Sequence, residues 1–331
     1  MEITTLIVIV ILLALLFDFL NGVHDSSNIV ATMISSRAFS PVTALGMTAL
    51  AEFSGPFLFG VAVATTIGNE VVTAGTITAH VLAAALLSAI LWNLLTWYMG
   101  FPSSSSHALV GGFIGAVLIS VGWEAVHQPG LQKVLLALFV SPIVGFIIGW
   151  LILRLVYLLC CRATPSVNGL FKKSQLVTAL ALALSHGSND AQKTMGIITL
   201  ALVTSGYLTV FEVPLWVVLI CAGMIALGTA VGGWRLIRTL GGKFFKIRPV
   251  DGIASQFASA AVILSASFFG GPVSTTQVVS SAIMGVGAAE RVNKVRWGVA
   301  GDIALAWLLT IPATALAGAG LHWVLFRFIP Q

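Results

Sequence analysis

The amino-acid sequence predicts an all-α polytopic membrane protein made of two inverted-topology repeats of about five segments each. Three observations predict this fold: the composition, a series of long apolar runs, and four internal matches that occur in the same order in both halves. Apolar residues make up 58% of the 331 residues, and charged residues only 8%. Soluble domains carry about 25% charged residues, so lipid must cover most of this chain.

Apolar runs long enough to cross a hydrocarbon core of about 30 Å recur along the chain. Charged, glycine and proline residues separate them into helices at about 3–36, 42–67, 76–99, 103–122 and 133–160 in the first half. The second half has helices at about 175–204, 213–236, 251–270, 274–289 and 296–326. The first segment of each half is too long for one plain span and carries polar residues in its middle, so we expect a break there.

The four internal matches divide the chain into a first transmembrane repeat (1–160), a short cytoplasmic linker (161–174) and a second, inverted transmembrane repeat (175–331). The matched segments are Gly22-Val-His-Asp25 with Gly187-Ser-Asn-Asp190, GMTALAEFSGP (46–56) with GMIALGTAVGG (223–233), Pro102-Ser-Ser-Ser-Ser-His107 with Pro272-Val-Ser-Thr-Thr-Gln277, and Pro142 with Pro312. Because each half holds an odd number of segments, the second half must begin on the opposite side of the membrane.

Most of the basic residues fall in or beside loops that this parity places on one side. These residues are Arg37, Arg154, Arg162, Lys172, Lys173, Arg235, Arg238, Lys243, Lys246, Arg248, Arg291, Lys294 and Arg296. Since Lys and Arg accumulate in cytoplasmic loops, we predict a multi-pass protein of the plasma (inner) membrane with both termini outside. Inverted repeats are an architecture of secondary transporters, with the substrate held near the midplane, although some channels share the design.

Matched polar residues in the first segment of each half predict a cation site. They stand at the same three offsets on one helix face: Asn21, Asp25 and Asn28 in the first half, and His186, Asp190 and Lys193 in the second. Ionised carboxylates inside a membrane are costly, so they are functional-site candidates by default. Gly22 and Gly187 would let the backbone unwind beside them, and carbonyls with a carboxylate suit sodium, a proton or a hydrated divalent metal. The alternative is that Asp25 and Asp190 only cap broken helices.

Two hydroxyl-rich stretches predict an anion site. Each follows a proline and precedes a short apolar helix, whose free N–H groups and dipole attract anions. The alternative is ordinary helix capping with serine packing between helices. The predicted substrate-binding residues are Ser103, Ser104, Ser105, Ser106, Ser274, Thr275 and Thr276, then His107 and Gln277 directly after them, and the intramembrane Lys193.

These segments resemble the PiT family of inorganic phosphate transporters, and the resemblance covers nearly the whole length. The pieces that carry it are FDFLNGVHDSSNIVATMISSRAFSP, WNLLTWYMGFPSSSSHALVGG, LSHGSNDAQKTMG and GGPVSTTQ. The forms GVHDSSN and SHGSNDAQK are most similar to the bacterial branch of low-affinity phosphate permeases. The resemblance implies inverted repeats with broken helices and helical hairpins at the midplane, and a homodimer. It also implies coupling to protons and phosphate carried partly as a neutral metal–phosphate complex.

Two positions depart from the family pattern: Ser27 stands where alanine is usual, and Lys193 stands where the first half has Asn28. The resemblance implies that Asp25, Asn28, Asp190 and the stretches 104–106 and 274–276 line the substrate and cation sites. The full set of predicted cation ligands is Asp25, Asn28, Asn21, Asp190 and Asn189. We expect no cofactor and no resident metal.

We therefore predict a secondary active transporter that imports inorganic phosphate with a cation by alternating access. The proton is the preferred coupling ion, and sodium is the second choice. Sulfate symport by the same machinery and a passive oxyanion channel are alternatives. A remote alternative is an intramembrane aspartyl protease, which would use Asp25 and Asp190 but lacks the GxGD motif here. Apart from that alternative, the chain is not expected to be an enzyme.

Overall fold

The computed structural model describes residues 3–164, 166–234, 237 and 246–328. Arg235, Arg238 and Lys243 of the predicted cytoplasmic loops lie outside these described residues. Within them the chain is almost entirely helical, and the pairing of Val72 with Val126 is an isolated bridge. The predicted all-α class is thus confirmed.

Six helices of the described part are long and apolar enough to cross a membrane. They are α1 (Ile3–Ser35), α2 (Pro41–Phe59), α4 (Ala79–Met99), α6 (Gln128–Leu159), α10 (Pro249–Phe268) and α12 (Trp297–Phe328). The long helix α7 (Val167–Thr204) is not among them, because the polar signature around Asp190 lies within it. Since α7 begins at Val167, the turn after α6 is shorter than the predicted linker. The chain is a multi-pass membrane protein.

Two short helices begin at the hydroxyl-rich stretches. They are α5 (Ser105–Ser120) and α11 (Thr275–Glu290), each 16 residues long. At 1.5 Å per residue such a helix spans about 24 Å, less than a hydrocarbon core of about 30 Å. A helix of this length cannot cross the membrane alone, so α5 and α11 form hairpins with the helices packed beside them, α4 and α10.

The break expected in the first segment of each half is wrong: α1 and α7 are continuous helices. Gly22 and Gly187 instead allow close helix packing. A Cβ at Gly22 would lie 2.2 Å from the carbonyl oxygen of Ile225, and one at Gly187 would lie 2.2 Å from that of Glu52. The irregular backbone comes after α2, where Gly60 has a positive φ of 78°.

Short elements fill this irregular region and the other connections. They are α3 (Ala62–Thr65), the π-helical turn η1 (Thr66–Glu70), and the 3-10 turns η2 (Ala74–Thr76), η3 (Trp123–Ala125) and η4 (Val292–Lys294). Among the described residues, helix α8 (Leu215–Val231) follows α7.

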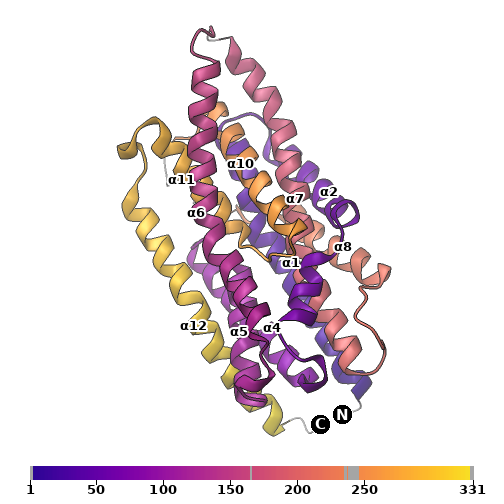
Figure 1. Cartoon of the computed structure of the whole chain (residues 1–331). Helices are drawn as coiled ribbons and strands as arrows, with labels where there is room; N and C mark the ends of the chain where they lie inside the picture. The colour runs from indigo at the N-terminus through magenta and orange to yellow at the C-terminus, as the bar shows by residue number, and fades with distance from the viewer. Residues whose placement is uncertain (1–2, 165, 235–236, 238–245, 329–331) are drawn as a thin grey trace.

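Helices of the two halves pack against each other in corresponding pairs. Helix α1 packs against α8, and its counterpart in the second half, α7, packs against α2. In the same way, α5 packs against α12, and its counterpart α11 packs against α6. Figure 1 shows these helices side by side in one elongated bundle. Two related halves that interlock would give this pattern, and the duplication itself stays a prediction from the sequence.

The basic turns gather at one end of the bundle. The turn between α6 and α7 and the turn between α11 and α12 lie toward one end, and both termini lie at the other (Figure 1). At the basic end Arg248 forms ion pairs with Asp251 and Glu290, and Lys294 lies 2.6 Å from Glu290. That this end faces the cytoplasm stays a prediction from the sequence.

Candidate functional site

Asp25 of α1 is held by the start of α11. Its Oδ1 accepts a hydrogen bond from Thr276 Oγ1 at 2.7 Å, and its Oδ2 accepts one from Thr275 Oγ1 at 3.3 Å. The Nδ1 atom of His24 lies 3.0 Å from Oδ1. Asp25 is only 2% exposed, so a carboxylate of the first half is buried against a hydroxyl stretch of the second.

Asp190 of α7 meets Asp25 at the same hydroxyl. Its Oδ2 accepts a hydrogen bond from Thr275 Oγ1 at 2.9 Å, and its Oδ1 pairs with Lys193. A hydroxyl has one proton, so Thr275 can donate to only one of the two carboxylates at a time. Two buried carboxylates that share one donor repel each other, so a proton or a positive charge beside them stabilises the pair, and Lys193 supplies one such charge to Asp190.

His186 lies between three carboxylates. Its Nε2 is 3.1 Å from Asp190 Oδ2 and 3.8 Å from Asp25 Oδ2, and its Nδ1 is 2.8 Å from Glu52 Oε1. Ligand atoms of Asp25, His186 and Asp190 lie within 4.8 Å of one another, a set that could hold a metal ion. We call Asp25, Glu52, His186, Asp190 and Lys193 the carboxylate cluster.

Two hydroxyls of the stretches are ordinary helix caps. Ser104 Oγ accepts a hydrogen bond from the backbone N–H of His107 at 3.1 Å, and Ser274 Oγ accepts one from that of Gln277 at 3.3 Å. The side chains of His107 and Gln277 approach each other to 3.4 Å. For Ser104 and Ser274 the capping alternative therefore describes what the side chains do in this structure.

The next two serines face a different environment. Ser106 Oγ receives a hydrogen bond from Lys193 Nζ at 2.6 Å and donates to the carbonyl of Val273 at 3.0 Å. Ser105 is buried at the start of the same helix, and its hydroxyl has no hydrogen-bond partner among the described residues. Ser106 thus brings the first hydroxyl stretch to the carboxylate cluster through Lys193.

Ser103 lies apart from these hydroxyls. Its Oγ accepts a hydrogen bond from Trp92 Nε1 at 2.7 Å and lies 3.2 Å from Thr310 Oγ1. These partners belong to α4 and α12, so the geometry does not support the predicted substrate contact of this side chain. The matched position in the other half is a valine, which already lacks a hydroxyl.

The three predicted asparagine ligands have different surroundings. Asn189 organises the turn before α11: its amide donates to Ser267 Oγ at 2.9 Å and to the Gly271 carbonyl at 3.2 Å, and its oxygen accepts from the Val273 N–H at 3.2 Å. Since all these groups are engaged, its role is to position the turn. Asn28 donates to Thr276 Oγ1 at 3.0 Å. Asn21 is buried one helical turn before Asp25, with its side-chain oxygen unpartnered in the described structure.

Sequence reasoning missed Gln192 and Ser26, which fix irregular backbone. Gln192 accepts from the N–H of Val63 at 2.8 Å and donates to the carbonyl of Gly60 at 2.6 Å, which holds the break after α2. Ser26 accepts from the N–H of Gly233 at 2.8 Å and so holds the end of α8. Ser26 and Gln192 directly follow the matched segments that end at Asp25 and Asp190. The signal that could have identified them was a polar side chain on a membrane helix.

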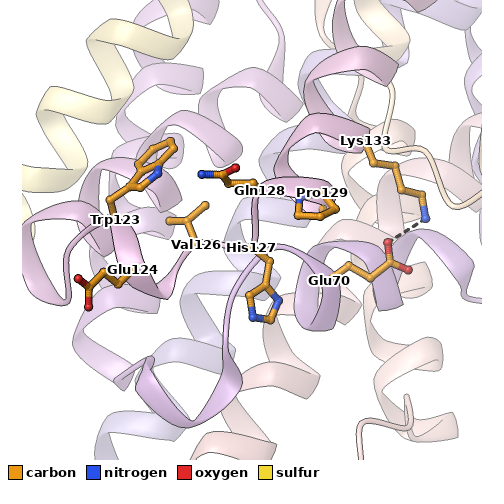
Figure 2. Close-up of a pocket in the computed structure, with 9 residues that line it drawn as sticks. Glu70, Trp123, Glu124, Val126, His127, Gln128, Pro129 and Lys133 are labelled. Carbon is orange, nitrogen blue, oxygen red and sulfur yellow. Dashed lines mark hydrogen bonds and ion pairs between the residues drawn. The ribbon is translucent and has the colours of Figure 1, made fainter.

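A surface pocket of about 850 Å³ lies away from the carboxylate cluster. It is lined by Glu70, Trp123, Glu124, Val126, His127, Gln128, Pro129, Gly130 and Lys133. Figure 2 shows the ion pair of Lys133 with Glu70 on one side of the pocket. Trp123 and Glu124 lie on the opposite side. A Cβ at Gly270 would lie 3.2 Å from Lys133 Nζ, so one edge of the pocket meets the turn that leads into α11.

Known proteins match the chain over almost its full length. The probable low-affinity inorganic phosphate transporter of Rhizobium meliloti is 46% identical over 316 residues, which cover 95% of each chain. The protein with the same description in Bacillus subtilis is 43% identical over 324 residues, which cover 97% of each chain. A solved structure of a sodium-dependent phosphate transporter has a TM-score of 0.90 at 24% identity, and covers 98% of this chain and 100% of that one.

The solved structure shows that the fold is shared. A family model described as the phosphate transporter family matches residues 21–167 and 160–318. These two segments contain both matched signatures and both hydroxyl stretches. The chain belongs to the phosphate transporter family, the PiT family that its signatures resemble.

Proposed function

We propose that the protein imports inorganic phosphate together with a cation, with the proton as the coupling ion. The names of the relatives support phosphate as the substrate. The interlocked helix pairs support two inverted repeats that alternate around a common site. Asp25, Asp190 and the hydroxyls at the starts of α5 and α11 form that site in this proposal.

The observation that carries the proposal is the shared hydroxyl. Thr275 Oγ1, in the first turn of α11, lies 3.3 Å from Asp25 Oδ2 and 2.9 Å from Asp190 Oδ2. The start of a helix attracts anions through its free N–H groups. Here that start also contacts two carboxylates, which repel an anion, so cations bound at the acids favour anion binding beside them. Anion binding and cation binding are then coupled by charge.

The membrane potential gives the same requirement. Bringing one unit of negative charge into a cell costs about 2.3 kcal/mol per 100 mV of inside-negative potential. A divalent phosphate therefore needs accompanying positive charge to accumulate. A divalent metal that travels with phosphate as cargo would meet the same need, and Asp25, His186 and Asp190 have the geometry to hold one.

His186 and Glu52 support the proton as the coupling ion. The imidazole lies between the two site carboxylates and Glu52, and each of these groups can accept or release a proton. Glu52 is fully buried and has no counterpart in the other half, where Thr229 stands. A group that only one half provides suits a single proton relay better than a symmetric pair of sodium sites.

Uptake of radiolabelled phosphate into proteoliposomes tests the proposal. We expect an inward proton gradient to drive accumulation above equilibrium, and a sodium gradient of equal ionic strength to drive none. Excess unlabelled sulfate should leave phosphate uptake unchanged, because the proposal assigns the site to phosphate. Protein-free liposomes give the background, and equilibration without accumulation under every gradient would contradict active transport.

The unpartnered hydroxyl of Ser105 gives a prediction about the anion. If it donates to phosphate, Ser105→Ala removes a hydrogen bond to a charged group, worth about 1.5–3 kcal/mol. We expect calorimetry to show phosphate binding weakened by about ten- to a hundredfold. Thr275→Ala should weaken it as well, but that change also alters both carboxylates, so Ser105 gives the cleaner result.

Ser103→Ala is the matched control, because the Ser103 hydroxyl contacts Trp92 and Thr310. It lies two positions from Ser105, and its loss should leave phosphate affinity unchanged. Equal affinities for the wild type and Ser105→Ala would move the anion away from the start of α5.

A further inference from the structure

The two halves differ at one position of the carboxylate cluster. Three residues after the carboxylate, the first half has Asn28 and the second half has Lys193. Each bonds to a hydroxyl of the opposite half: Asn28 Nδ2 donates to Thr276 Oγ1 at 3.0 Å, and Lys193 Nζ donates to Ser106 Oγ at 2.6 Å. Thr276 and Ser106 are themselves matched positions in the two hydroxyl stretches. The two halves therefore correspond in this contact, which an amide makes in the first half and an ammonium in the second.

The ammonium of Lys193 is surrounded by three kinds of oxygen. It pairs with the Asp190 carboxylate and donates to the carbonyl of Val273 at 2.8 Å and to the hydroxyl of Ser106 at 2.6 Å. Lys193 is only 2% exposed. Carboxylate, carbonyl and hydroxyl oxygens are the ligands that hard cations take in proteins. The lysine thus puts a fixed positive charge inside a set of oxygens suited to a free ion.

The first half has matching oxygens without an ammonium. Asp25 Oδ1 and Thr276 Oγ1 lie 2.7 Å apart, and the Asn28 amide lies beside the same hydroxyl. The Asn28 side-chain oxygen is buried and has no hydrogen-bond partner among the described residues. The titratable neighbours of Asp25 are His24, at 3.0 Å, and His186, at 3.8 Å. An amide oxygen, a hydroxyl and a carboxylate are here available to a mobile cation.

We propose that Lys193 is a tethered cation that takes the place of one transported cation in the second half. Only the Asp25 half then binds a mobile cation, and each cycle moves one positive charge fewer than a transporter with an ion in both halves. This inference rests on the proposed cation-coupled function and specifies its stoichiometry. It gives Lys193 a role that does not require direct contact with phosphate.

The first test counts ions without transport. Radioactive sodium, as an alkali-ion probe, is bound to the purified full-length protein in nanodiscs in the absence of phosphate. We expect the wild type to bind at most one sodium ion per chain. Lys193→Asn makes the second half match the first, and should bind one ion more than the wild type. The double variant Lys193→Asn/Asp190→Asn should lose that additional ion.

Lys193→Arg is the matched control, since it keeps the positive charge and should add no ion. If the Lys193→Asn protein is poorly folded without sodium, its ions cannot be counted directly, and its melting temperature is measured instead. Its melting temperature should rise when sodium chloride replaces choline chloride, by more than those of the wild type and Lys193→Arg, because a bound ion stabilises the folded state.

Three results would overturn the inference. The wild type could bind two sodium ions per chain, a monodisperse Lys193→Asn protein could bind no additional ion, or sodium could fail to stabilise a poorly folded Lys193→Asn protein. None of these measurements contains phosphate. Failure of phosphate uptake in proteoliposomes would therefore count against the proposed function and leave the ion count unaffected.

Discussion

Asp25→Asn and Asp190→Asn should each reduce coupled phosphate accumulation in proteoliposomes to the level of protein-free vesicles. Asparagine keeps the shape of the side chain but removes the charge that a cation must meet. At Asp25 it also weakens the two hydrogen bonds from the start of α11, at 2.7 and 3.3 Å. Bonds to charged groups are worth about 1.5–3 kcal/mol each, so the expected loss exceeds a hundredfold.

Asp302→Asn is the control for these variants. Asp302 also lies on a membrane-spanning helix, α12, but it is exposed at the surface of the bundle. Its loss should leave accumulation unchanged. Asp190→Asn leaves Lys193 without its carboxylate, so size-exclusion chromatography must accompany the uptake measurement, and Asp25→Asn gives the clearer comparison. Wild-type accumulation by Asp25→Asn would remove this residue from the cation site.

Gly228→Leu should abolish the folded protein. A Cβ at Gly228 of α8 would lie 2.0 Å from the carbonyl oxygen of Phe19 and 2.9 Å from the backbone nitrogen of Val23, both in α1. Backbone atoms cannot turn aside as side chains do, so the two helices must separate. Overpacking by even a few atoms costs about 1–3 kcal/mol, and separation of a helix pair costs more, against a total stability of about 5–15 kcal/mol.

Gly223 offers a matched control on the same helix, because a Cβ there would have nothing within 4 Å. Gly223→Leu should give a wild-type elution profile and melting temperature in detergent. The measurement for both variants is the yield of monodisperse protein and its thermal melt. A Gly228→Leu protein that melts like the wild type would show that α1 and α8 pack less closely than described.

The membrane spans and the two clusters of polar residues could be predicted because each depends on local sequence. Lipid requires long apolar runs, and acids such as Asp25 and Asp190 stand out against them. The matched order of the segments then indicated that Asp25 and Asp190 occupy equivalent positions in the two halves. The structure adds that the second hydroxyl stretch reaches the acids, since Thr275 and Thr276 donate to the carboxylates directly.

The predictions that failed depended on distant partners. Gly22 and Gly187 suggested unwound helices, since a glycine in a helix can serve a bend or a close contact. The carbonyl oxygens of Ile225 and Glu52, which lie close to these two glycines, show that both glycines serve close helix contacts. Glu52 has no acidic counterpart in the other half, where Thr229 stands, so the comparison of the two halves assigns it no role. Its partner His186 lies on α7, far along the chain.

The packing of α1 on α8 has a consequence for biosynthesis. Thr229 of α8 bonds to the carbonyl of Gly22 across 207 residues of sequence. At a synthesis rate of about 5–20 residues per second, α1 is made about 10–40 s before its partner. During that interval Asp18 lacks Thr194, its hydrogen-bond donor on α7, and Asp25 lacks the donors on α11. An unpaired acid in lipid costs about 3 kcal/mol, and His24 remains beside Asp25 in the first half, so Asp18 is the acid that disfavours release of the first half into lipid before the second half arrives.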